Sequence, residues 1–142
     1  MCFGQDTLFF DAKWNSTTKA NAEFFRIDKK VDNKWTRTDY YKTNQIQMKG
    51  TYSSLTPETE DGYFEWYHAN GKLKHKGSYK NGKHIGEHLW YGENGNIEAK
   101  ENYKDGKLNG AYEEYYSNGK LRDKSSFLDG IQDGWTVYYR DV

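Results

Sequence analysis

The stretch from Gly110 to Asp133 reads GAYEEYYSNGKLRDKSSFLDGIQD, and the segments on both sides of it repeat the same pattern. The glycines Gly62, Gly86, Gly110 and Gly134 stand 24 residues apart. Further columns keep this spacing: Tyr67, Tyr91, Tyr115 and Tyr139; Leu73, Ile97 and Leu121; Tyr79, Tyr103 and Phe127. Several independent columns with one period indicate internal repeats, and such repeats determine the architecture of a chain.

Each unit contains two short runs rich in Tyr, Trp and Phe, separated by Asn-Gly or Asp-Gly pairs. This pattern predicts a strand, a turn, a second strand and a second turn. Glycine accepts positive φ without steric cost, and Asn and Asp tolerate it better than most residues. The sequence therefore predicts a mainly β fold, an antiparallel β-meander of stacked hairpin repeats behind a short β-rich amino-terminal cap.

Residues 6–142 are expected to form one repeat domain, with a cap and a degenerate repeat over 6–61 and three and a half repeats over 62–142. The degenerate copy has repeat spacing at Tyr40, Ile46, Gly50 and Tyr52. Residues 53–61, which include the single proline Pro57, are predicted to form a longer, mobile loop. Residues 1–5, Met1 to Gln5, are read either as a flexible start or as the remnant of an export signal.

The turn chemistry gives a first assignment of the two sheet faces. A three-residue loop at Ala69-Asn70-Gly71 would set His68 opposite Lys72 and place Tyr67 on the face of Leu73. The same reasoning for Lys80-Asn81-Gly82 keeps Tyr79 on that face. The buried face is then predicted to carry Tyr67, Leu73, Tyr79, Leu89, Tyr91, Ile97, Tyr103, Tyr115, Leu121, Phe127, Val137 and Tyr139.

The opposite face is then aromatic where a solvated sheet face is normally polar. We expect its rings to be the partner-binding residues: Phe64, Trp66, Trp90, Tyr112, Tyr116 and Tyr138. Aromatic rings among charged side chains are the mixture enriched at interface hot spots. Packing against the cap or against a second copy of the chain is an equally open interpretation of the same rings.

Composition and charge exclude several classes of function. Lys plus Arg equals Asp plus Glu at 21 each, so bulk charge favours neither nucleic acid nor an anionic membrane. Cys2 is the only cysteine, which rules out an internal disulfide. No run is long enough to span a bilayer.

The segment His84-Ile85-Gly86-Glu87-His88 matches a zinc protease pattern, H-x-x-E-H. That chemistry needs both histidines on one face of a helix, whereas this segment straddles a repeat glycine on a predicted strand. Glu113 and Glu114 are neighbours on a strand and are expected to point to opposite faces. We therefore expect no metal, no cofactor and no catalytic residue, and hence no enzyme; a zinc hydrolase is the least favoured hypothesis.

The unit from Gly110 to Asp133 resembles the variant MORN repeat found in bacterial proteins, commonly labelled as YwqK-type antitoxins. The resemblance rests on Glu114-Tyr115-Tyr116, Asn118-Gly119-Lys120-Leu121, Phe127 and Asp129-Gly130, and the segment YHANGKLKHKGSYKNGK from Tyr67 matches equally well. It implies a β-meander that binds rather than catalyses. Its expected partner is another protein, with a toxin as one candidate, and its compartment is either the bacterial cytoplasm or outside it.

An alternative function uses the same aromatic face. A carbohydrate or lipid-headgroup binder would stack its ligand on Trp66 and Trp90. This alternative predicts that glycans quench the tryptophan fluorescence, and an exported location would favour it.

Overall fold

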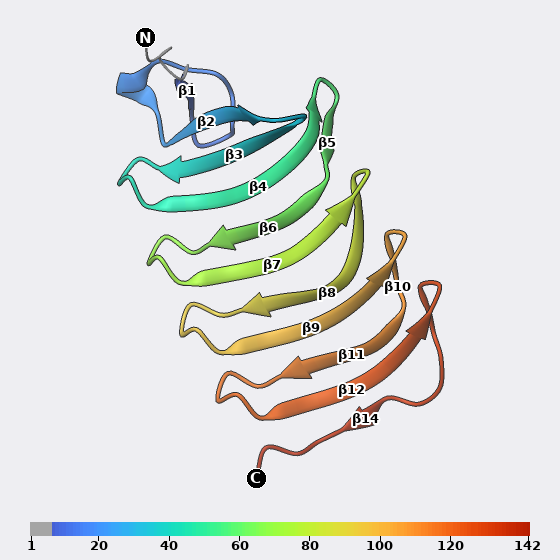
Figure 1. Cartoon of the computed structure of the whole chain (residues 1–142). Helices are drawn as coiled ribbons and strands as arrows, with labels where there is room; N and C mark the ends of the chain where they lie inside the picture. The colour runs from blue at the N-terminus through green and yellow to red at the C-terminus, as the bar shows by residue number, and fades with distance from the viewer. Residues whose placement is uncertain (1–6) are drawn as a thin grey trace.

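A computed structural model of the chain describes residues 7–142, and the expectation for residues 1–5 lies outside this range. The chain forms one antiparallel sheet in which strands follow one another in sequence order, with β1 at one end and β14 at the other (Figure 1). The strands are β1 (Thr7–Phe10), β2 (Phe24–Val31), β3 (Lys34–Tyr41), β4 (Ile46–Leu55), β5 (Glu58–Glu60), β6 (Gly62–Tyr67), β7 (Leu73–Lys80), β8 (Lys83–Tyr91), β9 (Ile97–Lys104), β10 (Lys107–Leu108), β11 (Gly110–Tyr115), β12 (Leu121–Leu128), β13 (Ile131–Gln132) and β14 (Val137–Tyr138). A 3-10 helix, η1 (Lys19–Asn21), lies between β1 and β2.

The predicted meander of hairpin repeats is confirmed. Each unit pairs one long strand (β4, β7, β9 or β12) with a returning strand that is bent or interrupted near its middle. The interruption falls at the repeat glycine, and Gly86 in β8 has φ 67°. A Cβ atom at Gly86 would meet nothing within 4 Å, so glycine is required there by backbone conformation and not by space. The evenly spaced glycines are therefore the bends of the sheet.

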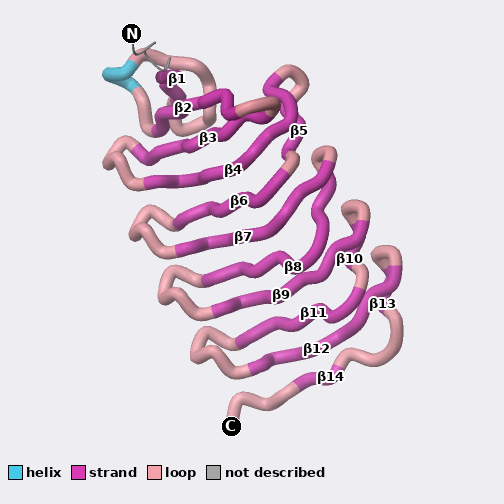
Figure 2. Tube along the Cα trace, viewed as in Figure 1, coloured by secondary structure: helices cyan, strands magenta, loops and turns pink. Residues whose placement is uncertain are grey.

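The turns gather along two edges of the sheet, as Figure 2 shows, and the two edges use different turns. At the first edge, His68 N donates to Lys72 O at 2.8 Å and Gly71 has φ 84°, which confirms the predicted three-residue loop. At the second edge, Lys80 pairs directly with Lys83. Asn81 and Gly82 are both left-handed, which defines a two-residue type I′ turn, and the three-residue prediction is wrong there.

A β-bulge in each unit reverses the alternation of side chains between the two faces. β6 and β7 pair regularly as far as Trp66 and His75, after which Tyr67 pairs with Leu73. Lys74 is therefore one extra residue in β7. Since a one-residue shift moves every following side chain to the other face, a facing assignment carried through Lys74 is inverted beyond it. The same register shift recurs in the pairs β3–β4, β8–β9 and β11–β12.

The predicted faces are consequently wrong in part: the buried face carries Tyr79, Tyr103 and Phe127, as expected, but it also carries rings that were expected on the opposite face. We define the inner face as the one that carries the fully buried rings of Phe64 and His88, both 0% exposed. The inner face also carries Trp66, Trp90, Tyr112, Tyr79, Tyr103 and Phe127. Tyr67, Tyr91 and Tyr115, which were expected to be buried, lie on the opposite, outer face beside lysines. Of the six rings predicted as the exposed surface, Phe64 is fully buried, and Trp66, Trp90 and Tyr112 lie partly buried on the inner face.

The core is a narrow chain of rings that crosses successive strands on the inner face. Its members are Tyr52, Phe64, Tyr79, His88 and Tyr103, with centroid separations of 5.1, 5.0, 5.3 and 5.0 Å. Each contact is edge to face, the geometry that the ring quadrupole favours. Such large rings give a single-layer sheet its buried area without a second layer.

Glycines in the long strands make room for this core. A Cβ atom built on Gly77 would lie 2.2 Å from His88 Nδ1, and one built on Gly50 would lie 2.0 Å from Phe64 Cε1. The rings therefore rest directly on the neighbouring backbone. The equivalent positions in the later units, Glu101 and Ser125, carry side chains, so the packing of the inner face changes along the array.

The predicted loop over 53–61 is instead a hairpin. Leu55 pairs with Glu58 around a turn that contains a cis Thr56–Pro57 peptide. Arg37, nearly fully buried, binds Glu58 Oε1 through Nη1 at 2.6 Å and also binds both oxygens of Asp28. The segment is therefore tied to β3 through a charged inner-face network.

Candidate functional site

One cross-strand row of directly paired residues runs along the inner face through most of the sheet. We call it the inner row. Its members, in order, are Leu8, Arg26, Asp39, Met48, Trp66, His75, Trp90, Ala99, Glu114, Asp123 and Tyr138. Paired residues of this kind have Cβ atoms about 4.5–5.5 Å apart and interact directly. The inner row is therefore a continuous sequence of side-chain contacts whose chemistry changes from strand to strand.

The centre of the inner row is a stack of three aromatic rings. The His75 imidazole lies between the two indoles, 4.7 Å from the Trp66 ring and 3.7 Å from the Trp90 ring, and it is nearly parallel to both. Trp66 also stacks against Phe64 at 5.4 Å. Trp66 therefore stacks against two rings, Phe64 and His75, whereas Trp90 stacks against His75 alone.

Hydrogen bonds fix the tautomers of the two buried histidines. His88 Nε2 lies 3.0 Å from the Ser78 carbonyl, which only accepts, so Nε2 carries the proton and donates. His88 Nδ1 is then an acceptor for His75 Nε2, which is 3.0 Å away. Each imidazole thus donates one N–H, in a chain of hydrogen bonds that ends on the backbone. Burial lowers the pKa of His75 to about 4, and burial likewise lowers the pKa of His84 and of His88.

The ring stack ends abruptly at Ala99, the smallest side chain of the inner row. Ala99 pairs with Trp90 on one side and with Glu114 on the other. A hollow of about 480 Å³ opens here, which we call the Trp90 pocket; its walls include Trp90, Glu98, Ala99, Glu101, Glu114 and Arg122. The Trp90 side chain therefore lines a pocket at the position where the row would otherwise continue with another ring.

The Trp90 pocket carries an excess of negative charge. Three carboxylates line it, Glu98, Glu101 and Glu114, against the one guanidinium of Arg122. Arg122 is already paired with Glu114 and with Asp123, at 2.9 Å from Nε to Oδ2 in the second case. Glu101 Oε2 accepts from Trp90 Nε1 at 2.8 Å and from Tyr103 Oη at 2.9 Å, which fixes the carboxylate at the edge of the indole.

The six predicted partner-binding residues lie in different environments in the structure. Phe64 is fully buried, so its expected exposure is wrong. Trp66, Trp90 and Tyr112 lie together on the inner face and are only partly exposed. Tyr116 lies at a turn, where its hydroxyl donates to the Tyr139 carbonyl at 3.0 Å and so holds adjacent repeats together.

The sixth residue, Tyr138, ends the inner row in β14 and is 78% exposed. The structure thus brings Trp66, Trp90 and Tyr138 into one row, but strands that carry Ala99, Glu114 and Asp123 separate Trp90 from Tyr138. Whether these residues bind a partner stays a prediction.

The sequence reasoning missed Ala99 and Glu101 as members of the site. A signal existed in the repeat columns, because Ala99 occupies the column of His75 and Glu114 the column of Trp90. A small or acidic residue in a column that elsewhere carries a ring marks the position where the ring stack stops.

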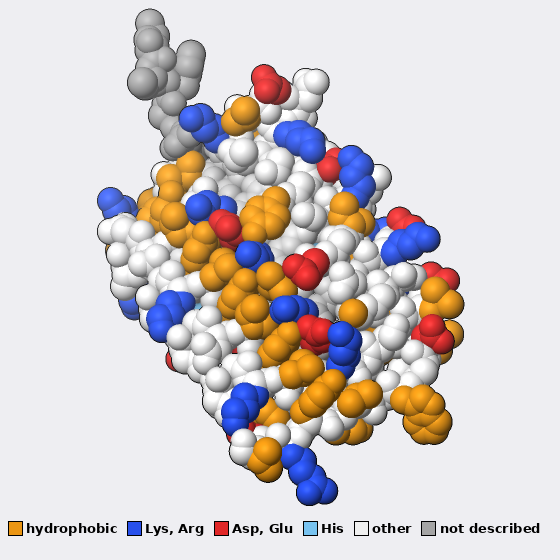
Figure 3. Space-filling model, turned by 60° about the horizontal axis from the view of Figure 1, so that its bottom comes forward, with side chains coloured by type: hydrophobic (Ala, Val, Ile, Leu, Met, Phe, Trp, Pro, Cys, Tyr) orange, Lys and Arg blue, Asp and Glu red, His pale blue; other side chains and the backbone are white. Residues whose placement is uncertain are grey.

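The outer face offers a different arrangement of rings and charges. Lys49, Lys76 and Lys100 lie over the rings of Tyr67, Tyr91 and Tyr115 at 5.7, 5.9 and 5.5 Å. The Tyr67 and Tyr115 hydroxyls donate to Glu65 and Glu113 at 2.6 Å. Burial and the bond to Glu65 raise the pKa of Tyr67 to about 12. Seen from the side drawn in Figure 3, the molecule carries a band of hydrophobic side chains interleaved with both signs of charge. Each of these three outer-face rings therefore has its own cation.

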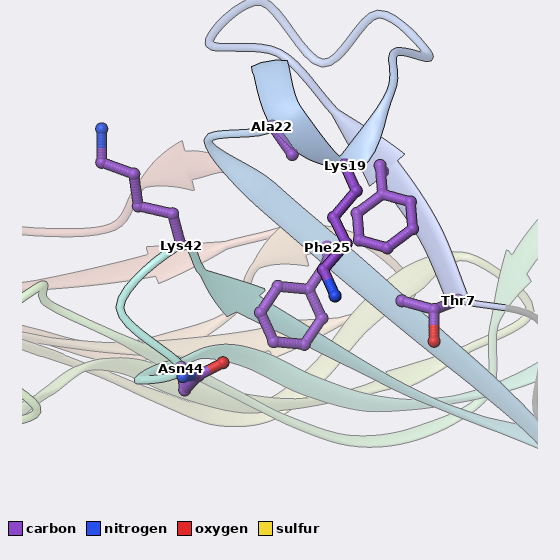
Figure 4. Close-up of a pocket in the computed structure, with 7 residues that line it drawn as sticks. Thr7, Lys19, Ala22, Phe25, Lys42 and Asn44 are labelled. Carbon is purple, nitrogen blue, oxygen red and sulfur yellow. The ribbon is translucent and has the colours of Figure 1, made fainter.

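A second hollow, of about 310 Å³, lies near the amino-terminal end of the sheet and includes Phe25, Lys19 and Lys42 in its walls. In Figure 4, Lys19 lies close to the Phe25 ring while the Lys42 chain extends away from it. Lys42 is paired with Glu23 at 2.8 Å. The walls of this hollow carry two lysines and no carboxylate, the opposite charge to the Trp90 pocket, and its Phe25 ring is stacked on Tyr40 at 4.7 Å.

Over residues 7–142, no group of three His, Cys, Asp or Glu side chains is placed to hold a metal ion. His84 and His88 of the zinc-like pattern stack on each other at 4.6 Å, and both nitrogens of His88 are used in hydrogen bonds. Within the same range, the structure contains no helix of the length and apolarity that crossing a membrane requires.

Comparison with known proteins supports the repeat interpretation. A family model described as MORN repeat variant matches residues 60–81, 85–105 and 108–129, which cover the region from β6 to β12. MORN repeats are generally non-catalytic modules that bind proteins or membranes. Three segments of the chain are thus similar to this variant repeat, as expected from the sequence, whereas the antitoxin relationship stays a prediction. No curated protein matches the chain.

Proposed function

We propose that the chain is a non-catalytic protein-binding module whose partner contacts the inner row at the Trp90 pocket. The observation that carries this proposal is the interruption of the ring stack at Ala99, which leaves an indole beside a charged hollow. Interface hot spots are enriched in Trp, Tyr and Arg that lie in well-packed pockets. The Trp90 pocket supplies such an anchor on a strand of the sheet, which is a rigid support.

The outer face supports this function less well. Its tyrosine hydroxyls and lysines already bind neighbouring side chains, as in the pair between Lys124 Nζ and Glu113 Oε1 at 3.0 Å. A partner on that face would have to replace or cover satisfied pairs, and covering exposed pairs adds little affinity. The Trp90 pocket instead has a surplus of carboxylate that a partner of opposite charge would balance.

Site-specific photo-crosslinking tests the proposal. We place p-benzoylphenylalanine at Glu98, an exposed wall of the Trp90 pocket, and in a matched variant at Tyr63, which is 49% exposed on the outer face. In extract of the organism that encodes the chain, we expect one defined protein adduct from position 98 and none from position 63. The reverse pattern, or the same adducts from both positions, would contradict the proposal.

An antitoxin or immunity role is the narrower form of this proposal, in which the captured partner is a toxin. The motive is the sequence resemblance described above. The test is to express the captured protein alone and together with this chain. Growth arrest that is relieved by the wild-type chain, and not by a variant in the Trp90 pocket, supports the narrower form; growth without arrest rules it out.

A further inference from the structure

We propose that the Trp90 pocket is a receptor for a planar cation, the guanidinium group of an arginine side chain presented by the partner protein. This inference rests on the proposed function and specifies the chemistry of the partner. It follows from the interrupted stack of rings, from the charge of the walls, and from the bonding state of those walls.

The geometry of the inner row specifies a flat group. On one side of Trp90, the row places the His75 imidazole parallel to the indole at 3.7 Å. On the other side, the paired residue is Ala99, whose side chain ends at Cβ. The space beside Trp90 that a ring at position 99 would occupy is therefore left open. A flat group as thin as an imidazole fits that space.

The charge of the pocket specifies a cation. The walls contain three carboxylates and one guanidinium, a net charge of about −2 with all of them ionised. A cation over an indole face is attracted by the ring quadrupole, and tryptophan gives the strongest attraction of the aromatic residues. The wall and the ring therefore favour the same sign of charge.

The hydrogen bonds of the wall specify a donor. Both bonds to Glu101, from Trp90 Nε1 and from Tyr103 Oη, end on Oε2. Oε1 of the same carboxylate remains for an incoming N–H group. A guanidinium presents several N–H donors in one plane, so it can stack on the indole and bind a carboxylate at the indole edge at once. An ammonium group can do only one of these well, because it is not planar and is more strongly hydrated.

Arg122 does not already serve as the occupant. Its guanidinium is bonded to Glu114 and Asp123, and it is not among the cations that lie over aromatic rings in residues 7–142. Arg122 instead neutralises the far wall. Ala99→His offers a sharp test, because it copies into the fourth position of the stack the residue that unit one carries at His75.

The experiment uses the full chain labelled with nitrogen-15 and follows the indole N–H resonance of Trp90, assigned with Trp90→Phe. The probe is Nα-acetyl-arginine N-methylamide, with the citrulline and lysine analogues as neutral and non-planar controls. We expect a saturable shift with the arginine probe in the millimolar range, at least tenfold weaker binding of both analogues, and at least tenfold weaker binding to Ala99→His and Glu101→Gln. Glu65→Gln, on the outer face, is the matched control and should bind as the wild type does.

No shift up to about 100 mM arginine probe, an equal shift with citrulline, or undiminished binding to Ala99→His would each overturn the inference. An equal shift with the lysine probe would overturn the planar requirement. If the arginine probe fails while the adduct from position 98 persists, the cation receptor falls and the protein-binding function stands. If arginine binds and no adduct forms, the protein-binding function falls and the cation receptor stands.

Discussion

His75 Nε2 lies 3.0 Å from His88 Nδ1, and the proton between them belongs to His75. A second proton on His88 Nδ1 would point at the first, so His88 accepts no charge while this hydrogen bond is in place. Burial acts in the same direction, since His75 is 4% exposed and His88 is fully buried. Burial therefore favours the neutral form of both imidazoles, that of His75 in the inner row and that of His88 beside it.

Acid is expected to destabilise the fold. The pKa of His75 is about 4 in the folded chain and 6.5 when unperturbed, so only the unfolded state takes up the proton as pH falls between these values. The contribution of neutral His75 to the free energy of unfolding is fully present above pH 6.5. It decreases as the pH falls to about 4, and the total loss from this group is about 3 kcal/mol. Urea unfolding at pH 7.5, 6 and 5 measures the loss. His75→Phe should flatten the profile, and an unchanged slope in that variant would assign the effect to other groups.

Gly77→Ala should destabilise the sheet severely. The added methyl would lie 2.2 Å from the buried His88 ring, which has no space to retreat because it also contacts Tyr79 and Tyr103. Overpacking of this kind costs about 1–3 kcal/mol or more. Urea denaturation gives the value, with Ser125→Ala as the control, because Ser125 holds the same repeat position and already has a Cβ. Equal stability of the two variants would mean that the His88 ring is not seated on Gly77.

Asn94→Ala should weaken the junction between adjacent turns. Asn94 Oδ1 accepts from the Asn96 backbone at 2.9 Å, and Asn94 Nδ2 donates to the Ser117 carbonyl of the next unit at 3.0 Å. Loss of both bonds at an exposed turn costs about 1–2 kcal/mol. Amide hydrogen exchange should accelerate in the turn around Gly95 and in the turn around Gly119. Acceleration confined to the first turn would show that the bond between units contributes nothing.

The repeat period, the hairpins and the bends at the glycines could all be predicted from the sequence, because each depends on local turn chemistry and on a column visible in the chain. The faces could not. Lys74 has no feature that marks it as a bulge residue, yet this one extra residue moves Tyr79 to the face opposite Tyr67. The two-residue turn at Asn81-Gly82 was equally ambiguous, since Asn-Gly suits either turn length.

The candidate site was predictable in part for the same reason. Trp66 and Trp90 were correctly identified as members of one face, because they lie in one repeat column. The pocket itself depends on what pairs with Trp90 across the strand, and that required the register. Ala99 opens the pocket because its side chain is small. A single alanine is not a recognisable signal in the sequence, so this role could not be predicted.

The most direct test of the account is the affinity of the crosslinked partner for the wild-type chain and for Ala99→His, measured by isothermal titration calorimetry. The extra imidazole fills the Trp90 pocket without touching the outer face, so we predict at least a tenfold loss of affinity with an unchanged unfolding midpoint at pH 7.5. Equal affinity for both chains would contradict the claim that the partner binds in the Trp90 pocket.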